Sequence, residues 1–76
     1  MNIKKIFKIF EDILDIKKGV ISHGTKPSDI DEWDSIATVN IIVALEDEFN
    51  IKFKLKDLQK LRDVQDFIKL VEKYKL

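Results

Sequence analysis

Apolar residues recur at intervals of three and four along two long stretches of this chain, which is the spacing of one helix face. In residues 3–16 these positions are Ile3, Ile6, Phe7, Phe10, Ile13 and Leu14, with charged residues between them. In residues 35–49, which contain neither Pro nor Gly, the apolar stripe is Ile36, Val39, Ile42, Val43 and Phe49, widened by Ile41 and Leu45. Both stretches are therefore predicted to be helices.

The segment between these two helices, residues 17–33, is predicted to be a long loop. It contains Gly19, Gly24 and Pro27 and is rich in Ser, Thr and Asp, a composition that disfavours regular structure. Loops of this length in a small domain are usually functional or disordered. The residues expected to anchor it to the helices are Val20, Ile21, Ile30 and Trp33.

The segment after residue 49 is interpreted as a connector followed by a short helix. Asn50 is a natural left-handed end for the second helix. Residues 51–55 alternate apolar residues with Lys, but a lone strand would have no partner, so an extended connector is favoured. It leads into a short helical turn around Asp57, Leu58 and Leu61.

A last helix is predicted after Asp63, whose side chain is expected to cap it. Its inward face is expected to consist of Val64, Phe67, Ile68, Val71 and Tyr74. The predicted fold is therefore all-α, a small four-helix bundle with three main helices and one short helix. A single domain is expected over residues 1–76.

Length and composition narrow the possible functions. A chain of 76 residues buries a thin core and has little room for an enclosed active site, which disfavours an autonomous enzyme. There is no Cys, and the one His, His23, is expected to be a solvated loop residue, so neither a disulfide nor a metal site is expected. Charged residues interrupt the apolar N-terminal stretch, so we expect a cytoplasmic protein without signal peptide or transmembrane segment.

Charge is balanced overall but unevenly distributed. Fourteen basic and fourteen acidic residues give a net charge of zero, which disfavours a general nucleic-acid binder. All charged residues between positions 29 and 48 are acidic, namely Asp29, Asp31, Glu32, Asp34, Glu46, Asp47 and Glu48. The last three lie in the final turn of the predicted second helix, where each opposes the helix dipole at a cost of up to about 1 kcal/mol. A role in partner recognition would account for that cost.

Ser35 lies where the loop ends and the second predicted helix begins. Unpaired N–H groups and the positive end of the helix dipole favour a negatively charged substituent at this position. The hydroxyl is therefore well placed to carry a phosphate ester. The alternative is a simple N-cap serine, which is worth about 1 kcal/mol to the helix. Asp34 could serve as a cap or first-turn carboxylate.

The sequence Asp34-Ser35-Ile36 at the start of a helix, with Ala44-Leu45-Glu46-Asp47-Glu48-Phe49 and Val64-Gln65-Asp66 downstream, resembles the acyl carrier proteins over nearly the whole chain. The resemblance implies that a separate phosphopantetheinyl transferase attaches 4′-phosphopantetheine from coenzyme A to Ser35. It also implies a monomeric carrier, not an enzyme, whose arm holds acyl or aminoacyl groups as thioesters. Further partners would be an acyl-loading ligase or transferase and acyl-consuming enzymes.

The resemblance also implies roles for residues near Ser35. Asp34 would take part in transferase recognition, and Ile36 would be an apolar contact for partner enzymes. Val39 and Val43 match positions that line an acyl cleft in some carriers, although an ordinary core position is favoured for Val39. Trp33 is expected to pack the end of the loop against the second helix.

The sequence departs from the resemblance in its charge. Ala37 and Asn40 occupy positions where acids are common, and fatty-acid synthase carriers are strongly acidic overall, whereas this chain is neutral. We therefore expect a specialised stand-alone carrier in a dedicated pathway, such as secondary-metabolite, surface-glycan or aminoacyl/acyl modification chemistry. The alternative is an unmodified carrier-like adapter that binds a protein partner through its acidic second helix.

Overall fold

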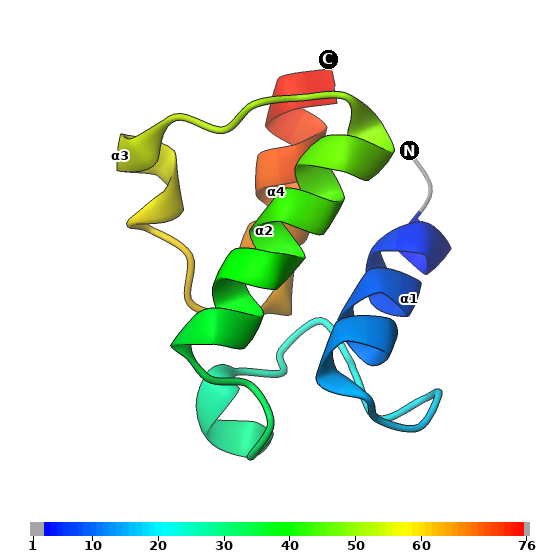
Figure 1. The fold of residues 1–76 in the computed structure, drawn as a ribbon. Helices are drawn as coiled ribbons and strands as arrows, with labels where there is room; N and C mark the ends of the chain where they lie inside the picture. Colours follow the sequence, from blue (N-terminus) through cyan, green and yellow to red (C-terminus); the bar gives the residue numbers. More distant parts are fainter. Residues whose placement is uncertain (1–2, 76) are drawn as a thin grey trace.

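A computed structural model describes residues 3–75, and within that range it contains four α-helices and no strand (Figure 1). The elements are α1 (Ile3–Leu14), a 3-10 helix η1 (Pro27–Asp29), α2 (Ser35–Phe49), α3 (Leu55–Leu58) and α4 (Val64–Lys75). The predicted all-α fold with one short helix is confirmed. Residues 1, 2 and 76 of the expected 1–76 domain lie outside the described residues.

The core lies between α1, α2 and α4. Its buried residues are Ile6, Phe10 and Leu14 from α1, Ala37, Ile41 and Leu45 from α2, and Val64, Phe67, Ile68 and Val71 from α4. Phe10 is at its centre, with ring centroids 5.3 Å from Trp33 and 5.2 Å from Phe67. These T-shaped pairs connect Trp33 of the loop to α1 and connect α1 to α4.

The first two helices end in the same way. Asp15 has a φ of 53°, and the Ile16 N–H donates to the Glu11 carbonyl oxygen at 3.1 Å, so α1 stops two residues earlier than expected. Asn50 has a φ of 55° and ends α2 at the predicted position. Helices commonly end at a residue with left-handed backbone geometry, near which an N–H group donates to a carbonyl oxygen of the last helical turn.

The loop between α1 and α2 contacts the helices through its side chains and through its backbone. Three of its four expected anchors are buried, but Val20 is exposed, so that part of the prediction is wrong. The backbone is held by α4, because the N–H groups of Val64 and Gln65 donate to the Thr25 and His23 carbonyl oxygens at 3.0 and 2.8 Å. The start of α4 therefore gains partners for two of its unpaired N–H groups.

The connector between α2 and α3 is extended, as expected, and packs on α4. Ile51 and Phe53 are half-buried, and the Phe53 ring lies edge-on to Tyr74 with centroids 5.1 Å apart. The Lys54 N–H donates to the Tyr74 hydroxyl at 2.8 Å. The buried member of α3 is Asp57 and not Leu58, which the sequence did not predict.

Candidate functional site

The N-terminus of α2 is capped by Asp34. This residue has extended backbone geometry, and its Oδ1 accepts a hydrogen bond from the Ala37 N–H at 2.8 Å. Ser35 is the first helical residue, so the interpretation of Ser35 as the N-cap is wrong and that of Asp34 as a cap is confirmed. Capping therefore leaves the serine side chain available for another role.

The Ser35 side chain is exposed at this helix end. Within residues 3–75 its hydroxyl has no hydrogen-bond partner, and the N–H groups of Ser35 and Ile36 are also unpaired. An exposed hydroxyl beside two free N–H groups, at the positive end of a helix of 15 residues, fits a covalently attached phosphodiester.

Hydrogen bonds from the side of the loop hold the backbone next to Ser35. The Trp33 indole is buried, and its Nε1–H donates to the Thr38 Oγ1 at 2.9 Å. The Thr38 hydroxyl in turn donates to the Asp34 carbonyl oxygen at 3.1 Å. The prediction that Trp33 packs the loop end against the second helix is confirmed. The serine side chain is thus free while its backbone is fixed.

An exposed apolar row, which we name the outer strip, runs along α2 from Ser35. It consists of Ile36, Val39 and Val43, which are 72%, 57% and 50% exposed and lie on one side of the helix through their spacing of three and four. The expectation that Val39 is a core residue is wrong. The apolar stripe predicted for α2 is divided, because these three residues face outward, whereas Ile41 and Leu45 are buried and Ile42 and Phe49 pack against the core. The docking role of Ile36 and the acyl-cleft role of Val39 and Val43 stay predictions.

Two of the three acids at the end of α2 make contacts within the protein. Glu46 is half-buried, and its Oε2 accepts a hydrogen bond from the Phe53 N–H at 2.9 Å. Glu48 lies 3.5 Å from the Lys5 Nζ, and Asp47 is exposed. Holding the connector is therefore one reason for an acid at position 46. The recognition role of all three stays a prediction.

The cationic side chain that compensates this helix end comes from α4. The Lys75 Nζ donates to the Phe49 carbonyl oxygen at 3.3 Å, which places a positive charge at the negative end of the α2 dipole.

At the other end of α2, Ala37 is buried, so an acid at that position could not join an exposed recognition surface. Asn40 is exposed and could.

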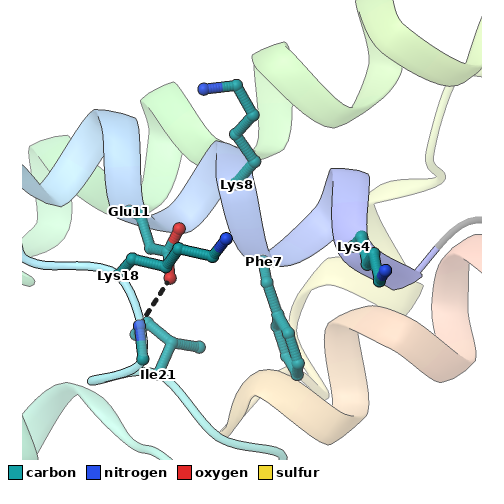
Figure 2. A pocket seen from close by; sticks show the side chains of 7 residues that line it. Lys4, Phe7, Lys8, Glu11, Lys18 and Ile21 are labelled. Carbon is teal, nitrogen blue, oxygen red and sulfur yellow. Dashed lines mark hydrogen bonds between the residues drawn. The ribbon is translucent and has the colours of Figure 1, made fainter.

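A surface pocket of about 520 Å³ lies between α1 and the following loop, lined by Lys4, Phe7, Lys8, Glu11, Lys18, Gly19 and Ile21 (Figure 2). Its one carboxylate, that of Glu11, accepts a hydrogen bond from the Gly19 N–H at 3.0 Å and so holds the loop. Gly19 has a φ of 94°, which favours glycine. None of the predicted site residues lines this pocket.

Residues 3–75 contain no cluster of His, Cys, Asp and Glu that could hold a metal ion. None of the helices in the same range is long and apolar enough to cross a membrane.

Comparison with known proteins points to one family. Residues 4–71 match the family model of a phosphopantetheine attachment site. The acyl carrier protein of Buchnera aphidicola is 36% identical over 73 residues, covering 96% of this chain and 91% of that protein. The acyl carrier protein of Solidesulfovibrio magneticus is 31% identical, covering 95% and 92%. The solution structure of the holo acyl carrier protein from Geobacter metallireducens superimposes with a TM-score of 0.84 at 41% identity, covering 93% and 82%.

Proposed function

The chain belongs to the acyl carrier protein family, and on this premise we propose that Ser35 is the residue that carries its 4′-phosphopantetheine arm. The protein is a carrier of acyl intermediates. The observation that supports Ser35 is its exposed hydroxyl, unpartnered within residues 3–75, at the start of α2 in the sequence Asp34-Ser35-Ile36. The capping bond of Asp34 keeps the first turn of α2 in place without occupying that hydroxyl.

Ser35 acts as a substrate residue and not as a catalyst. Its oxygen forms a bond to the phosphorus that bears the pantetheine moiety of coenzyme A, the nucleotide part of coenzyme A leaves, and the serine proton passes to the transferase. The new phosphodiester is negatively charged and lies beside the unpaired N–H groups of Ser35 and Ile36. The bound arm supplies a thiol that holds acyl or aminoacyl groups as thioesters.

The outer strip is the surface on which partner enzymes would dock. Its three exposed apolar side chains begin beside Ser35, and contiguous exposed apolar surface commonly marks an interaction site. We assign to this surface the phosphopantetheinyl transferase, an acyl-loading ligase or transferase and acyl-consuming enzymes. Asp34 and the acids Glu46, Asp47 and Glu48 would add charge to the encounter.

We propose a specialised carrier that acts as a monomer in the cytoplasm, and the neutral net charge supports its specialised role. Asn40 is exposed beside the outer strip and uncharged, so a partner with a strongly basic docking surface gains less attraction here than from an acidic carrier. Partners of this chain are therefore expected to bind mainly through apolar contacts with α2.

The test is the transfer of phosphopantetheine to the purified protein. Incubation with coenzyme A and a broad-specificity transferase is expected to add one phosphopantetheine to the wild type, read by intact mass. Ser35→Ala is expected to remain unmodified, whereas Ser28→Ala, which removes another exposed serine, is modified like the wild type. Modification of Ser35→Ala would place the arm elsewhere. An unmodified wild type, under conditions that modify a known carrier, would support the adapter instead.

A further inference from the structure

A second surface with distinctive chemistry lies on α3, the segments beside it and α4. Two adjoining hollows of about 210 Å³ each share Asp57 and Lys73 in their lining. Their cationic residues are Lys54, Lys56, Lys60, Lys69 and Lys73, which we name the lysine face. All five side chains are exposed.

The acids within the lysine face are engaged in internal contacts. Asp57 accepts a hydrogen bond from the Tyr74 hydroxyl at 2.6 Å and one from the Lys73 Nζ at 3.3 Å. Asp66 accepts from the Arg62 N–H at 2.9 Å. Within residues 3–75, the ammonium groups of the other four lysines make no hydrogen bond or salt bridge, although the charge of Lys56 acts on Asp57. The positive charge of this face is therefore largely uncompensated at the surface.

Apolar side chains lie among these lysines. Leu55 is 71% exposed and stands between Lys54 and Lys56 in the sequence. Leu61 and Leu70 line the second hollow. Lysine side chains can lay their aliphatic stems on such apolar surface while their ammonium groups extend outward. The face thus combines an exposed leucine with several exposed positive charges.

The lysine face and the Ser35 end of the molecule have opposite charge. Acids at positions 29, 31, 32 and 34 precede Ser35 without any intervening Lys or Arg. In Figure 1, α3 lies to one side of α2, at the end of the connector that follows α2. A negatively charged surface would therefore attract the lysine face and repel the Ser35 end.

We propose that the lysine face binds the surface of a lipid bilayer that contains anionic phospholipids, with Leu55 at the level of the headgroups and the Ser35 end turned toward the solvent. Lysines near such a surface are attracted by its negative potential, and an exposed leucine gains by burial at its apolar boundary. Protein interfaces, by contrast, are depleted in Lys and enriched in Arg and aromatic residues. The aromatic pair of this region, Phe53 and Tyr74, is packed internally.

The test measures co-flotation with vesicles, using the Ser35→Ala protein so that the result does not depend on the arm. We expect binding to vesicles of phosphatidylcholine with phosphatidylglycerol, weak binding to phosphatidylcholine alone, and release at high salt. Each lysine near an anionic surface strengthens binding about fivefold, so Lys54→Gln combined with Lys56→Gln should weaken it about 25-fold. Leu55→Gln should weaken it further.

The matched control removes the same charge elsewhere. Lys17→Gln combined with Lys18→Gln changes two exposed lysines of the loop and should leave vesicle binding within about twofold. Circular dichroism verifies that each variant is folded. The proposal is overturned by an equal loss in both double variants, by salt-insensitive binding to neutral vesicles, or by no binding of the parent protein. Salt-dependent dimers in sedimentation without vesicle binding would assign the face to a second copy.

Discussion

The two apolar faces of α2 are similar in composition and opposite in use. The inner face consists of Ala37, Ile41 and Leu45, spaced by four residues and buried against the other helices. The outer strip consists of Ile36, Val39 and Val43, at least half exposed. The inner face stabilises the fold, whereas the outer strip leaves apolar surface beside Ser35. Packing, and not hydrophobicity alone, distinguishes a structural face from a binding face.

The largest expected difference between these faces is in stability. Ile41 is fully buried, so Ile41→Ala should lower the free energy of unfolding by about 2–5 kcal/mol. Val43→Ala should change it by no more than about 0.5 kcal/mol, because the side chain is half exposed and Ala favours the helix. Urea denaturation of both variants measures the difference, and equal losses would contradict the distinction between the faces.

A smaller effect is expected at the start of the helix that carries both faces. Asp34→Ala removes the side-chain oxygen that accepts from the Ala37 N–H and should destabilise the protein by about 1 kcal/mol. Asp34→Asn keeps a capping oxygen and removes the charge, so its stability should stay near that of the wild type. The rate of phosphopantetheine transfer to Asp34→Asn then isolates recognition. A normal rate in this variant would argue against a recognition role for the charge.

Unlike the exposed outer strip, α3 and the connector before it are held on α4 by Tyr74, whose hydroxyl donates a hydrogen bond to Asp57 and accepts one from the Lys54 N–H. The hydrogen bond from the Tyr74 hydroxyl lowers the pKa of Asp57 from its ordinary value of 3.8. The same bond raises the pKa of Tyr74 from 10.0. The Asp57 contribution to stability is present above its ordinary pKa and is lost as the pH falls through the lowered value; the Tyr74 contribution is lost as the pH rises through the raised value.

Removing this hydroxyl should flatten the dependence of stability on pH. Tyr74→Phe keeps the ring that packs on Phe53 but removes the bond to Asp57. We expect a loss of stability near neutral pH and a smaller further loss below about pH 4 than in the wild type. Urea unfolding of both proteins across the acid range measures this. Parallel curves would show that the pair does not contribute.

The boundaries of α2 were predictable because both ends have local signals. An acid precedes the helix, and Asn50 tolerates the left-handed geometry that ends it. The faces of α2 were not predictable in the same way, because apolar residues occur nearly all round this helix. The spacing of four residues between Ala37, Ile41 and Leu45 could have indicated the buried face of α2, because a small residue such as Ala37 permits the close approach of a neighbouring helix.

The position of the candidate serine was predictable, but several contacts around it depend on tertiary structure. Glu46 holds the connector by accepting a hydrogen bond from the Phe53 N–H. These residues are seven positions apart, and they meet only because the chain changes direction after α2. Asp57 is buried because Tyr74, distant in the sequence, satisfies its carboxylate. Likewise, the lysine face gathers residues from α3, the segments on either side of it and α4, and no run of adjacent lysines marks it in the sequence.

The central claim is that Ser35 carries the arm of this carrier, and peptide mapping of the protein purified from its own source tests it most directly. Tandem mass spectrometry of the peptide that contains Ser35 should locate one phosphopantetheine on that residue, and acyl or aminoacyl cargo still attached would add its own mass. An unmodified Ser35 peptide, or phosphopantetheine on Ser22 or Ser28, would contradict the account.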